Sequence, residues 1–147
     1  ELAWQAIREG APIITDTNMG KSGINKKRLA NYGSEVYCFM ADEDVAEEAR
    51  KHGITRACAS MDKAARLGLN GIFAIGNAPT ALVRLHELMQ EGAIRPRLII
   101  GVPVGFVNVV QAKELILTDD VPYIVARGRK GGSNVAAAIC NALVNSI

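Results

Sequence analysis

The stretch GIFAIGNAPTAL, residues 71–82, decides the fold of this chain. All four residues from Ile72 to Ile75 are apolar, which is typical of a strand buried on both faces of a parallel sheet. Residues 78–91 carry apolar side chains at helical spacing, and Pro79 lies in the first turn, where its missing N–H costs nothing. The stretch therefore predicts a buried strand, a short loop containing glycine, and an amphipathic helix.

The same alternation continues on both sides of this stretch. Further short apolar runs predict four more strands, at residues 12–15, 36–40, 98–100 and 123–126. Helical spacing predicts helices at residues 2–9, 19–31 with an interruption near Gly23, 42–52, 57–67, 109–117 and 134–144, the last capped by Ser133. Alternating strands and helices predict one α/β domain over residues 1–147, with a five-stranded, mainly parallel, doubly wound sheet. We expect the strand order 3-2-1-4-5, which brings the loops after the first and fourth strands side by side.

Composition excludes several classes of function. The chain has 147 residues, a net charge of +2 and 49% apolar residues, so it is long and apolar enough for a folded core. This charge and the 5% of aromatic residues argue against a nucleic-acid binder. The longest apolar stretch, residues 98–110, is broken by glycine, proline and asparagine, which argues against a membrane span. The chain has three cysteines, Cys38, Cys58 and Cys140, without CxxC spacing, so we expect no disulfide framework. We therefore expect the protein in the reducing cytoplasm, with Cys38 and Cys140 in the core.

Ligands of doubly wound sheets bind at the carboxyl ends of the strands. The loops expected there are residues 16–23, 76–80, 101–106 and 127–134, and each opens onto a helix N-terminus whose free N–H groups favour anions. The last loop is basic, with Arg127, Arg129 and Lys130, whereas Met19 and the run 103–106 are apolar. This mixture suits a large, flat, apolar ligand fringed by carboxylates; the alternative for the basic run is a solvated loop.

Other catalytic patterns are incomplete. Gly20-Lys21-Ser22 resembles the end of a phosphate-binding P-loop, but Thr15 stands where that motif requires its first glycine. His52 falls at the end of a predicted helix and His86 falls beside an apolar stripe, so we expect structural roles for both. No Ser/His/Asp arrangement and no HExxH metal motif is present.

Seven short motifs occur along the chain: GAPI (10–13), DTNM (16–19), SGIN (22–25), GITR (53–56), IGNAPTAL (75–82), GVPVGFV (101–107) and GRKGGSN (128–134). Together, and in this order, they resemble one family, the precorrin-8X methylmutases, also called precorrin isomerases, with a cobalt-handling form, the cobalt-precorrin-8 methylmutases. The resemblance covers nearly the whole chain and implies a Rossmann-like, three-layer α/β/α fold. It also implies an isomerase of cobalamin biosynthesis that moves a methyl group from C11 to C12 of a corrin precursor, giving hydrogenobyrinate or cobyrinate, without a cofactor.

The resemblance implies a homodimer with its active site near the subunit interface. It places the catalytic histidine in a helical segment upstream of the GAPI motif, so this chain has no catalytic residue of its own and neither histidine takes that role. Because the chain begins at Glu1 inside a predicted helix, we expect that this N-terminal segment is missing. The alternative is then a corrinoid-binding fragment without turnover; a P-loop-like nucleotide-binding protein is a weaker alternative.

The resemblance also carries substrate-binding positions onto this chain. They are Asp16, Met19, Arg56, Asn77, Thr80, Val104, Gly105, Phe106 and Lys113. For Arg56 the alternative is an ordinary surface arginine at a helix start, and Asn77 and Thr80 would instead cap a helix and hold its turn. After GFV the family usually reads Glu-Ser-Lys, whereas this chain has Gln111-Ala112-Lys113, which keeps the lysine and loses the carboxylate and the hydroxyl.

Overall fold

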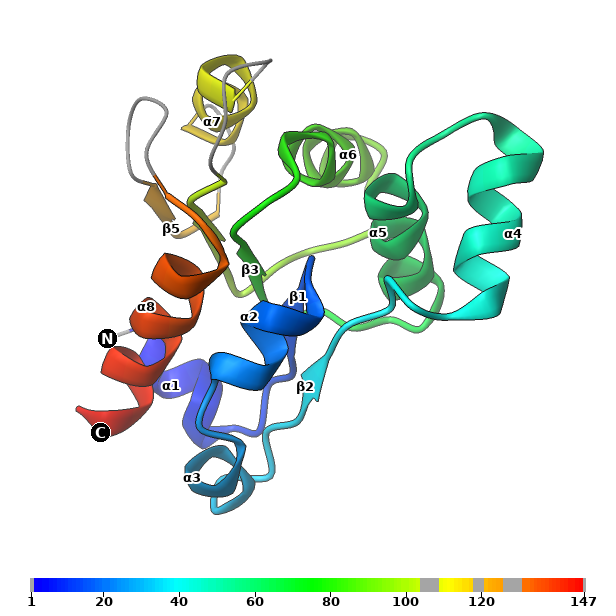
Figure 1. The fold of residues 1–147 in the computed structure, drawn as a ribbon. Coiled ribbons are helices and arrows are strands. Elements are labelled where there is room, and N and C mark those ends of the chain that lie inside the picture. Colours follow the sequence, from blue (N-terminus) through cyan, green and yellow to red (C-terminus); the bar gives the residue numbers. More distant parts are fainter. Residues whose placement is uncertain (1, 104–108, 118–120, 126–130, 147) are drawn as a thin grey trace.

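A five-stranded parallel sheet forms the centre of the computed structural model, which describes residues 2–103, 109–117, 121–125 and 131–146. Every strand pair is parallel and the strand order is β2-β1-β3-β4-β5. The strands are β1 (Ile13–Thr15), β2 (Val36–Tyr37), β3 (Ile72–Ile75), β4 (Leu98–Gly101) and β5 (Tyr123–Val125). This arrangement confirms the predicted α/β class with a parallel sheet (Figure 1).

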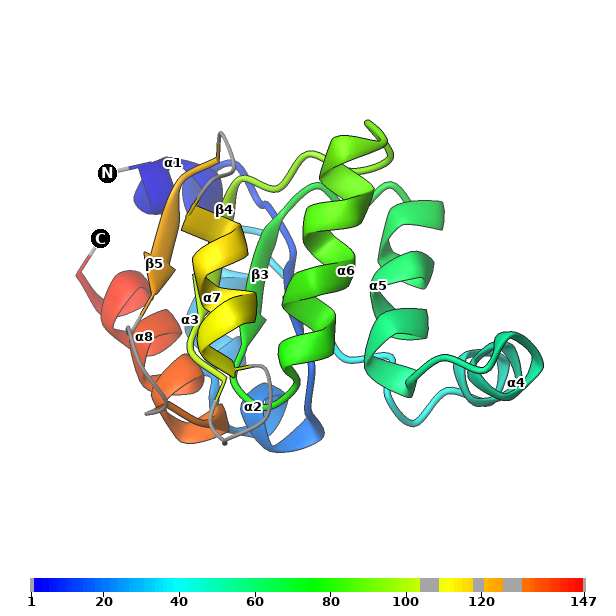
Figure 2. The same cartoon turned by 90° about the horizontal axis from the view of Figure 1, so that it is seen from above.

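Helices cover both faces of the sheet. The helices are α1 (Leu2–Arg8), α2 (Asn18–Gly23), α3 (Lys26–Ala30), α4 (Glu43–His52), α5 (Arg56–Arg66), α6 (Pro79–Gln90), α7 (Val109–Leu117) and α8 (Ser133–Asn145). Helices α5, α6 and α7 line one face, with α4 packed outside α5, as Figure 2 shows from above. Helices α1, α2, α3 and α8 cover the other face, so the three-layer α/β/α prediction is confirmed.

The two helical layers explain why Ile72 to Ile75 of β3 are apolar at every position. Ile14 and Phe73 pack in the cluster formed with α4 to α7, whereas their neighbours Ile13 and Ile72 pack in the cluster formed with α1, α3 and α8. Successive side chains of a strand point to opposite faces, so a strand covered on both sides must be apolar throughout. All residues of β1, β3 and β4 are buried.

The predicted strand order was wrong. The structure has the order 2-1-3-4-5, because the chain leaving β2 crosses over through α4 and α5 and pairs on the far side of β1. Strand β2 has only two residues and its Tyr37 is half-buried, which suits an edge of the sheet rather than a position inside it. The reversal of strand order therefore lies between β1 and β3, and the loops after these two strands are neighbours.

Two local predictions also need correction. Gly132, not Ser133, is the N-cap of α8, so the Ser133 side chain is available for another contact. Cys140 is buried as expected, but Cys38 is only half-buried. None of the described helices is long and apolar enough to cross a membrane.

Candidate functional site at the carboxyl edge of the sheet

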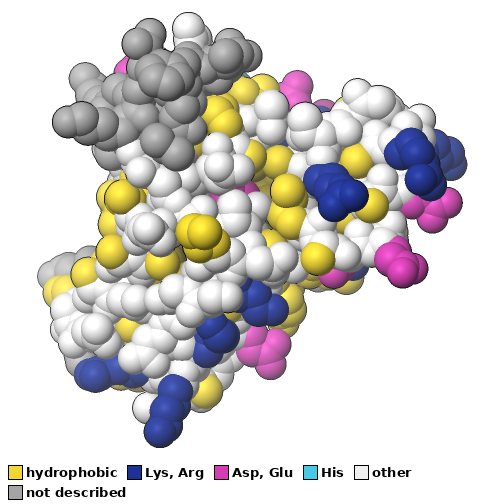
Figure 3. Space-filling view, in the orientation of Figure 1, with side chains coloured by type: hydrophobic (Ala, Val, Ile, Leu, Met, Phe, Trp, Pro, Cys, Tyr) yellow, Lys and Arg dark blue, Asp and Glu magenta, His cyan; other side chains and the backbone are white. Residues whose placement is uncertain are grey.

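The loops that follow β1 and β3 meet the start of α8 at the carboxyl edge of the sheet, which faces the viewer in Figure 1. The reversal of strand order between β1 and β3 lies at this edge, where ligands of doubly wound sheets bind. On this face, hydrophobic side chains gather between α2 and the helices α5 and α6 (Figure 3). The candidate site therefore includes the apolar surface that the sequence predicts for binding an apolar ligand.

Asp16 joins the two central loops. It follows β1 directly and is only 1% exposed. Its Oδ1 accepts a hydrogen bond from the backbone N–H of Gly76 at 2.9 Å, and its Oδ2 accepts from the N–H groups of Asn77 at 2.8 Å and Ala78 at 2.6 Å. Burial raises the pKa of the Asp16 carboxyl, while the three N–H donors oppose that rise because they favour the ionised form. Its carboxylate thus faces backbone groups in the interior.

Glycines allow the loops at this edge to touch. A Cβ atom on Gly76 would lie 2.6 Å from the carbonyl oxygen of Gly132 and 2.7 Å from Cα of Ser133. A Cβ on Gly131 would collide with the carbonyl of Val102, which accepts a hydrogen bond from the Gly132 N–H at 2.8 Å. Residues with side chains would force these backbones apart, so the glycines of the two loops serve close packing.

Thr55 and Thr80 join the starts of two helices, and Arg56 directly follows Thr55. Thr55 caps α5 by accepting a hydrogen bond from the Cys58 N–H at 3.1 Å, and its Oγ1 lies 3.2 Å from Oγ1 of Thr80 in the first turn of α6. Arg56 is the first residue of α5 and its side chain is exposed. The start of α5 therefore places an exposed arginine next to the start of α6 at the candidate site.

The other exposed positions are Asn77 and Met19. Asn77 lies in the β3–α6 loop that Asp16 holds, and its side chain is exposed. Met19 lies in the first turn of α2 and is 66% exposed. Neither Asn77 nor Thr80 caps α6, whose N-cap is Ala78 without a side-chain hydrogen bond.

The remaining predicted substrate-binding positions are either buried or outside the described residues. Lys113 is buried within α7, and this desolvation lowers the pKa of its ammonium group. Val104, Gly105 and Phe106 lie outside the described residues, as do the basic side chains of residues 127–130. The structure therefore brings Arg56, Asn77 and Thr80 to one edge but leaves Lys113 in the interior.

Sequence reasoning missed two hydroxyl groups at this edge. Thr17 caps α2 by accepting from the Gly20 N–H at 2.9 Å, and its Oγ1 lies 2.8 Å from Oγ of Ser133. Thr55 plays the corresponding part at α5. A threonine just before a helical stretch is an N-cap signal, so both residues could have been found from the sequence.

The alternative sites find no support in the geometry. Gly20, Lys21 and Ser22 lie inside helix α2 rather than in a loop before a helix, and Thr15 is buried in β1. His52 lies in the last turn of α4, and His86 is half-buried in the middle of α6. Among the described residues, no group of three or more His, Cys, Asp and Glu side chains is placed to hold a metal ion.

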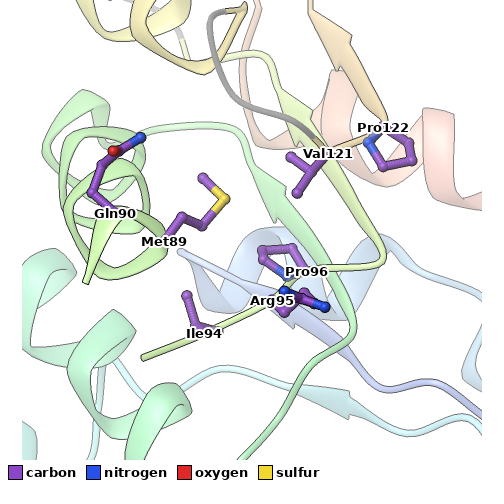
Figure 4. A pocket seen from close by; sticks show the side chains of 7 residues that line it. All are labelled: Met89, Gln90, Ile94, Arg95, Pro96, Val121 and Pro122. Carbon is purple, nitrogen blue, oxygen red and sulfur yellow. The ribbon is translucent and has the colours of Figure 1, made fainter. Parts of the chain in front are cut away.

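A pocket of about 480 Å³ lies elsewhere, at the amino ends of the strands (Figure 4). It is formed by the end of α6 and the segments that lead into β4 and β5, and it is lined by Met89, Gln90, Ile94, Arg95, Pro96, Val121 and Pro122. These residues belong to none of the seven motifs. We therefore place the candidate site at the carboxyl edge and not in this pocket.

Comparison with known proteins gives a consistent answer. The sequence pattern of the precorrin-8X methylmutases matches residues 1–146. Cobalt-precorrin-8 methylmutases from Leptospira interrogans and Priestia megaterium are each 47% identical, over 95% of this chain and over 67% and 62% of their own lengths. The crystal structure of a precorrin-8X methylmutase from Thermus thermophilus superposes with a TM-score of 0.88 at 42% identity, covering 98% of this chain and 70% of that one. This chain thus spans about two thirds of its relatives, and it belongs to the precorrin-8X methylmutase family.

Proposed function

We propose that the protein is an isomerase of cobalamin biosynthesis that moves a methyl group from C11 to C12 of precorrin-8X or its cobalt form, giving hydrogenobyrinate or cobyrinate. One observation carries the proposal. Parts of the motifs shared with the family meet at the carboxyl edge, in the loops after β1 and β3 and at the start of α8. Arg56, Asn77 and Thr80 have exposed side chains, and hydrophobic side chains gather on the face that this edge presents (Figure 3). A corrin precursor has an apolar ring and carboxylate side chains, and both find complementary groups on this edge.

The proposed methyl migration requires mainly that the protein orients the substrate. Reacting atoms of a methyl migration belong to one molecule, so holding the ring in one pose supplies much of the rate. A single general acid that protonates a ring nitrogen would supply the remaining rate acceleration. The described residues of the site are suited to holding the ring, because Arg56 pairs with a substrate carboxylate, and Asn77 and Thr80 donate hydrogen bonds to its polar edge.

Incubating the protein with precorrin-8X and with cobalt-precorrin-8 tests the proposal, because moving the methyl group changes the visible spectrum of the ring. Conversion of either substrate is the expected result, and the faster one identifies the physiological form. Tight binding with an unchanged spectrum would instead identify a corrinoid-binding protein. A protein that neither binds nor converts either compound would contradict the proposal.

Arg56→Ala tests the site itself. Losing a charge-assisted hydrogen bond of about 1.5 kcal/mol raises KM about tenfold, and Arg56→Lys restores only part of it because lysine cannot pair with two oxygens at once. Arg50→Ala removes an exposed arginine from the neighbouring helix α4 and serves as the matched control. If the Arg56 and Arg50 variants had equal kinetics, residues other than Arg56 would have to bind the substrate carboxylate.

We also propose that the protein works as a homodimer in the cytoplasm. The dimer follows the family resemblance, and the cytoplasmic location is supported by three cysteines that are all free in the structure. Light scattering during gel filtration measures the mass, and a mass of one chain would contradict the dimer. Fractionation of the native cells, followed by immunodetection, tests the location; recovery outside the cytoplasmic fraction would contradict it.

A further inference from the structure

We propose that Asp16 is a positioning residue: its buried carboxylate sets the conformation of loop 76–78 and thereby aims Asn77 and Thr80 at the substrate. The inference rests on the proposed function and deepens it. It assigns to Asp16 an indirect part, through the loop, in place of the substrate contact that the family resemblance implies.

Three consecutive backbone N–H groups converge on the Asp16 carboxylate, at 2.9, 2.8 and 2.6 Å. Successive N–H groups that point to one centre form a concave anion-binding site in many proteins. Here the protein's own carboxylate fills that site. The N–H groups of Gly76, Asn77 and Ala78 are therefore engaged, and Pro79 has none, so most of this loop does not offer the free donors expected from the sequence.

Asp16 is itself held in place. The Thr15 side chain donates a hydrogen bond to the carbonyl oxygen of Thr17 at 2.9 Å, which fixes the turn around Asp16 at the end of β1. Strand β1 is buried throughout and pairs with β3 in register, Thr15 beside Ala74. A carboxylate directly after a buried strand thus anchors the loop that leaves the neighbouring strand.

Other contacts hold the two ends of the loop, where Gly76 packs against Gly132 and Thr80 contacts Thr55. Helix α6 lacks a side-chain cap, and the exposed Asn77 side chain gains no orientation from burial. Its direction follows from the backbone that Asp16 holds. Asp16 is 1% exposed, so a substrate cannot reach the carboxylate and any effect on binding must pass through the loop.

Asp16→Asn is the sharpest variant. Asparagine has nearly the same shape, but it replaces one acceptor oxygen by an NH2 group that cannot accept from an N–H. At least one of the three amides then loses its partner, and the charge is lost from all three bonds. Glu47→Gln makes the same change of charge at an exposed residue of α4 and is the matched control.

The experiment combines amide hydrogen exchange by NMR with kinetics on the converted corrin substrate. In the wild type and in Glu47→Gln, the amides of residues 76–78 exchange slowly although their loop lies at the surface. In Asp16→Asn they exchange at least tenfold faster, KM rises about tenfold, and kcat stays within about twofold. A residue that only stabilised the fold would lower the active fraction, and hence the apparent kcat, with KM unchanged.

Unchanged KM in a folded Asp16→Asn variant would overturn the inference, and so would rapid exchange of the three amides in the wild type. If Asp16→Asn does not fold, Asp16→Glu makes the same comparison, since it keeps the charge but displaces the oxygens; an unchanged KM there overturns the inference equally. Failure of the proposed function looks different: the wild type itself then neither binds nor converts the substrate. Slow exchange at residues 76–78 would in that case still show that Asp16 anchors the loop. The proposed role of the loop in binding this substrate would be contradicted.

Discussion

Oγ1 of Thr17 and Oγ of Ser133 lie 2.8 Å apart, although 116 residues separate them in the sequence. The contact joins the first turn of α2, which follows β1, to the first turn of α8 near the end of the chain. Thr17 also caps α2 through the Gly20 N–H. A single hydroxyl therefore caps the start of one helix and links it to another at the edge that carries the candidate site.

Thr17→Val should remove both interactions while keeping the shape of the side chain. We expect the free energy of unfolding to fall by about 1–2 kcal/mol, the usual range for a lost N-cap together with a part-buried hydrogen bond. Urea titration followed by circular dichroism measures the change. Ser133→Ala loses only the contact with Thr17 and should cost about 0.5–1 kcal/mol; equal costs for the two variants would mean that the cap contributes nothing.

Gly76→Ala should separate two loops at the carboxyl edge. The new Cβ would meet backbone atoms of Gly132 and Ser133 at 2.6–2.8 Å, and backbone cannot rotate aside as a side chain does. We expect a loss of about 1–3 kcal/mol in the free energy of unfolding, typical of overpacking. The melting temperature, measured by calorimetry, should fall accordingly.

Gly101→Ala provides the control for this prediction. A Cβ there would meet side-chain atoms of Leu82 and Val125 at 3.4–3.5 Å, which is close to ordinary van der Waals contact. We therefore expect a much smaller change in melting temperature than for Gly76→Ala. Comparable losses in the two variants would contradict the view that loop contact at Gly76 is what requires glycine.

Cys140 should resist alkylation in the folded protein. Burial in α8 raises the pKa of its thiol to about 12. Since the thiolate is the reactive form and an ordinary thiol has a pKa of about 8.5, iodoacetamide should modify Cys140 at pH 8 about a thousandfold more slowly than in the unfolded chain. Peptide mass spectrometry after timed quenching measures the rates; equal rates in native protein and in urea would refute the prediction.

The same thiol gives a pH dependence of stability. Above pH about 8.5 the unfolded chain loses the thiol proton, whereas the folded protein keeps it. The unfolded state is then favoured, so this contribution to stability is present at lower pH and is lost as the pH rises toward 12. Cys140→Ala should show a smaller fall in the free energy of unfolding between pH 8 and pH 10 than the wild type.

The ion pair between α5 and α6 should stabilise the fold by a modest amount. Nε of Arg84 lies 2.7 Å from Oδ1 of Asp62, and both side chains are mostly covered, at 27% and 17% exposure. We expect Arg84→Met to cost about 1 kcal/mol, with a smaller difference in 1 M salt because salt screens the pair. Arg66→Met breaks a pair of similar length, 2.8 Å to Glu48, at a side chain that is 49% exposed, and it should cost less. Urea titrations at low and high salt measure both variants, and a larger loss for Arg66→Met would contradict the role of burial.

Local patterns were sufficient to predict the elements of this fold. Ile72 to Ile75 are apolar because both sheet faces are covered, and the stripe of Leu82, Leu85 and Leu88 marks the buried side of α6. Burial and periodicity act within a few residues, so the sequence shows them directly. The motifs likewise predict that Arg56, Asn77 and Thr80 belong to one site, and their roles in binding remain predictions.

The strand order and the partners of buried groups were decided by tertiary structure. Nothing near Val36 in the sequence shows that β2 forms the edge of the sheet, because that depends on which side of β1 the following strand pairs with. Asp16 could not be recognised as an anchor, since its three donors come from residues 76–78, about sixty positions away. The sequence by itself determined which segments form strands and helices and which family the chain resembles, because those signals are local. Only the packing of distant segments decided that the Asp16 carboxylate faces backbone N–H groups, because its desolvation had to be offset by donors that the folded sheet alone brings within reach.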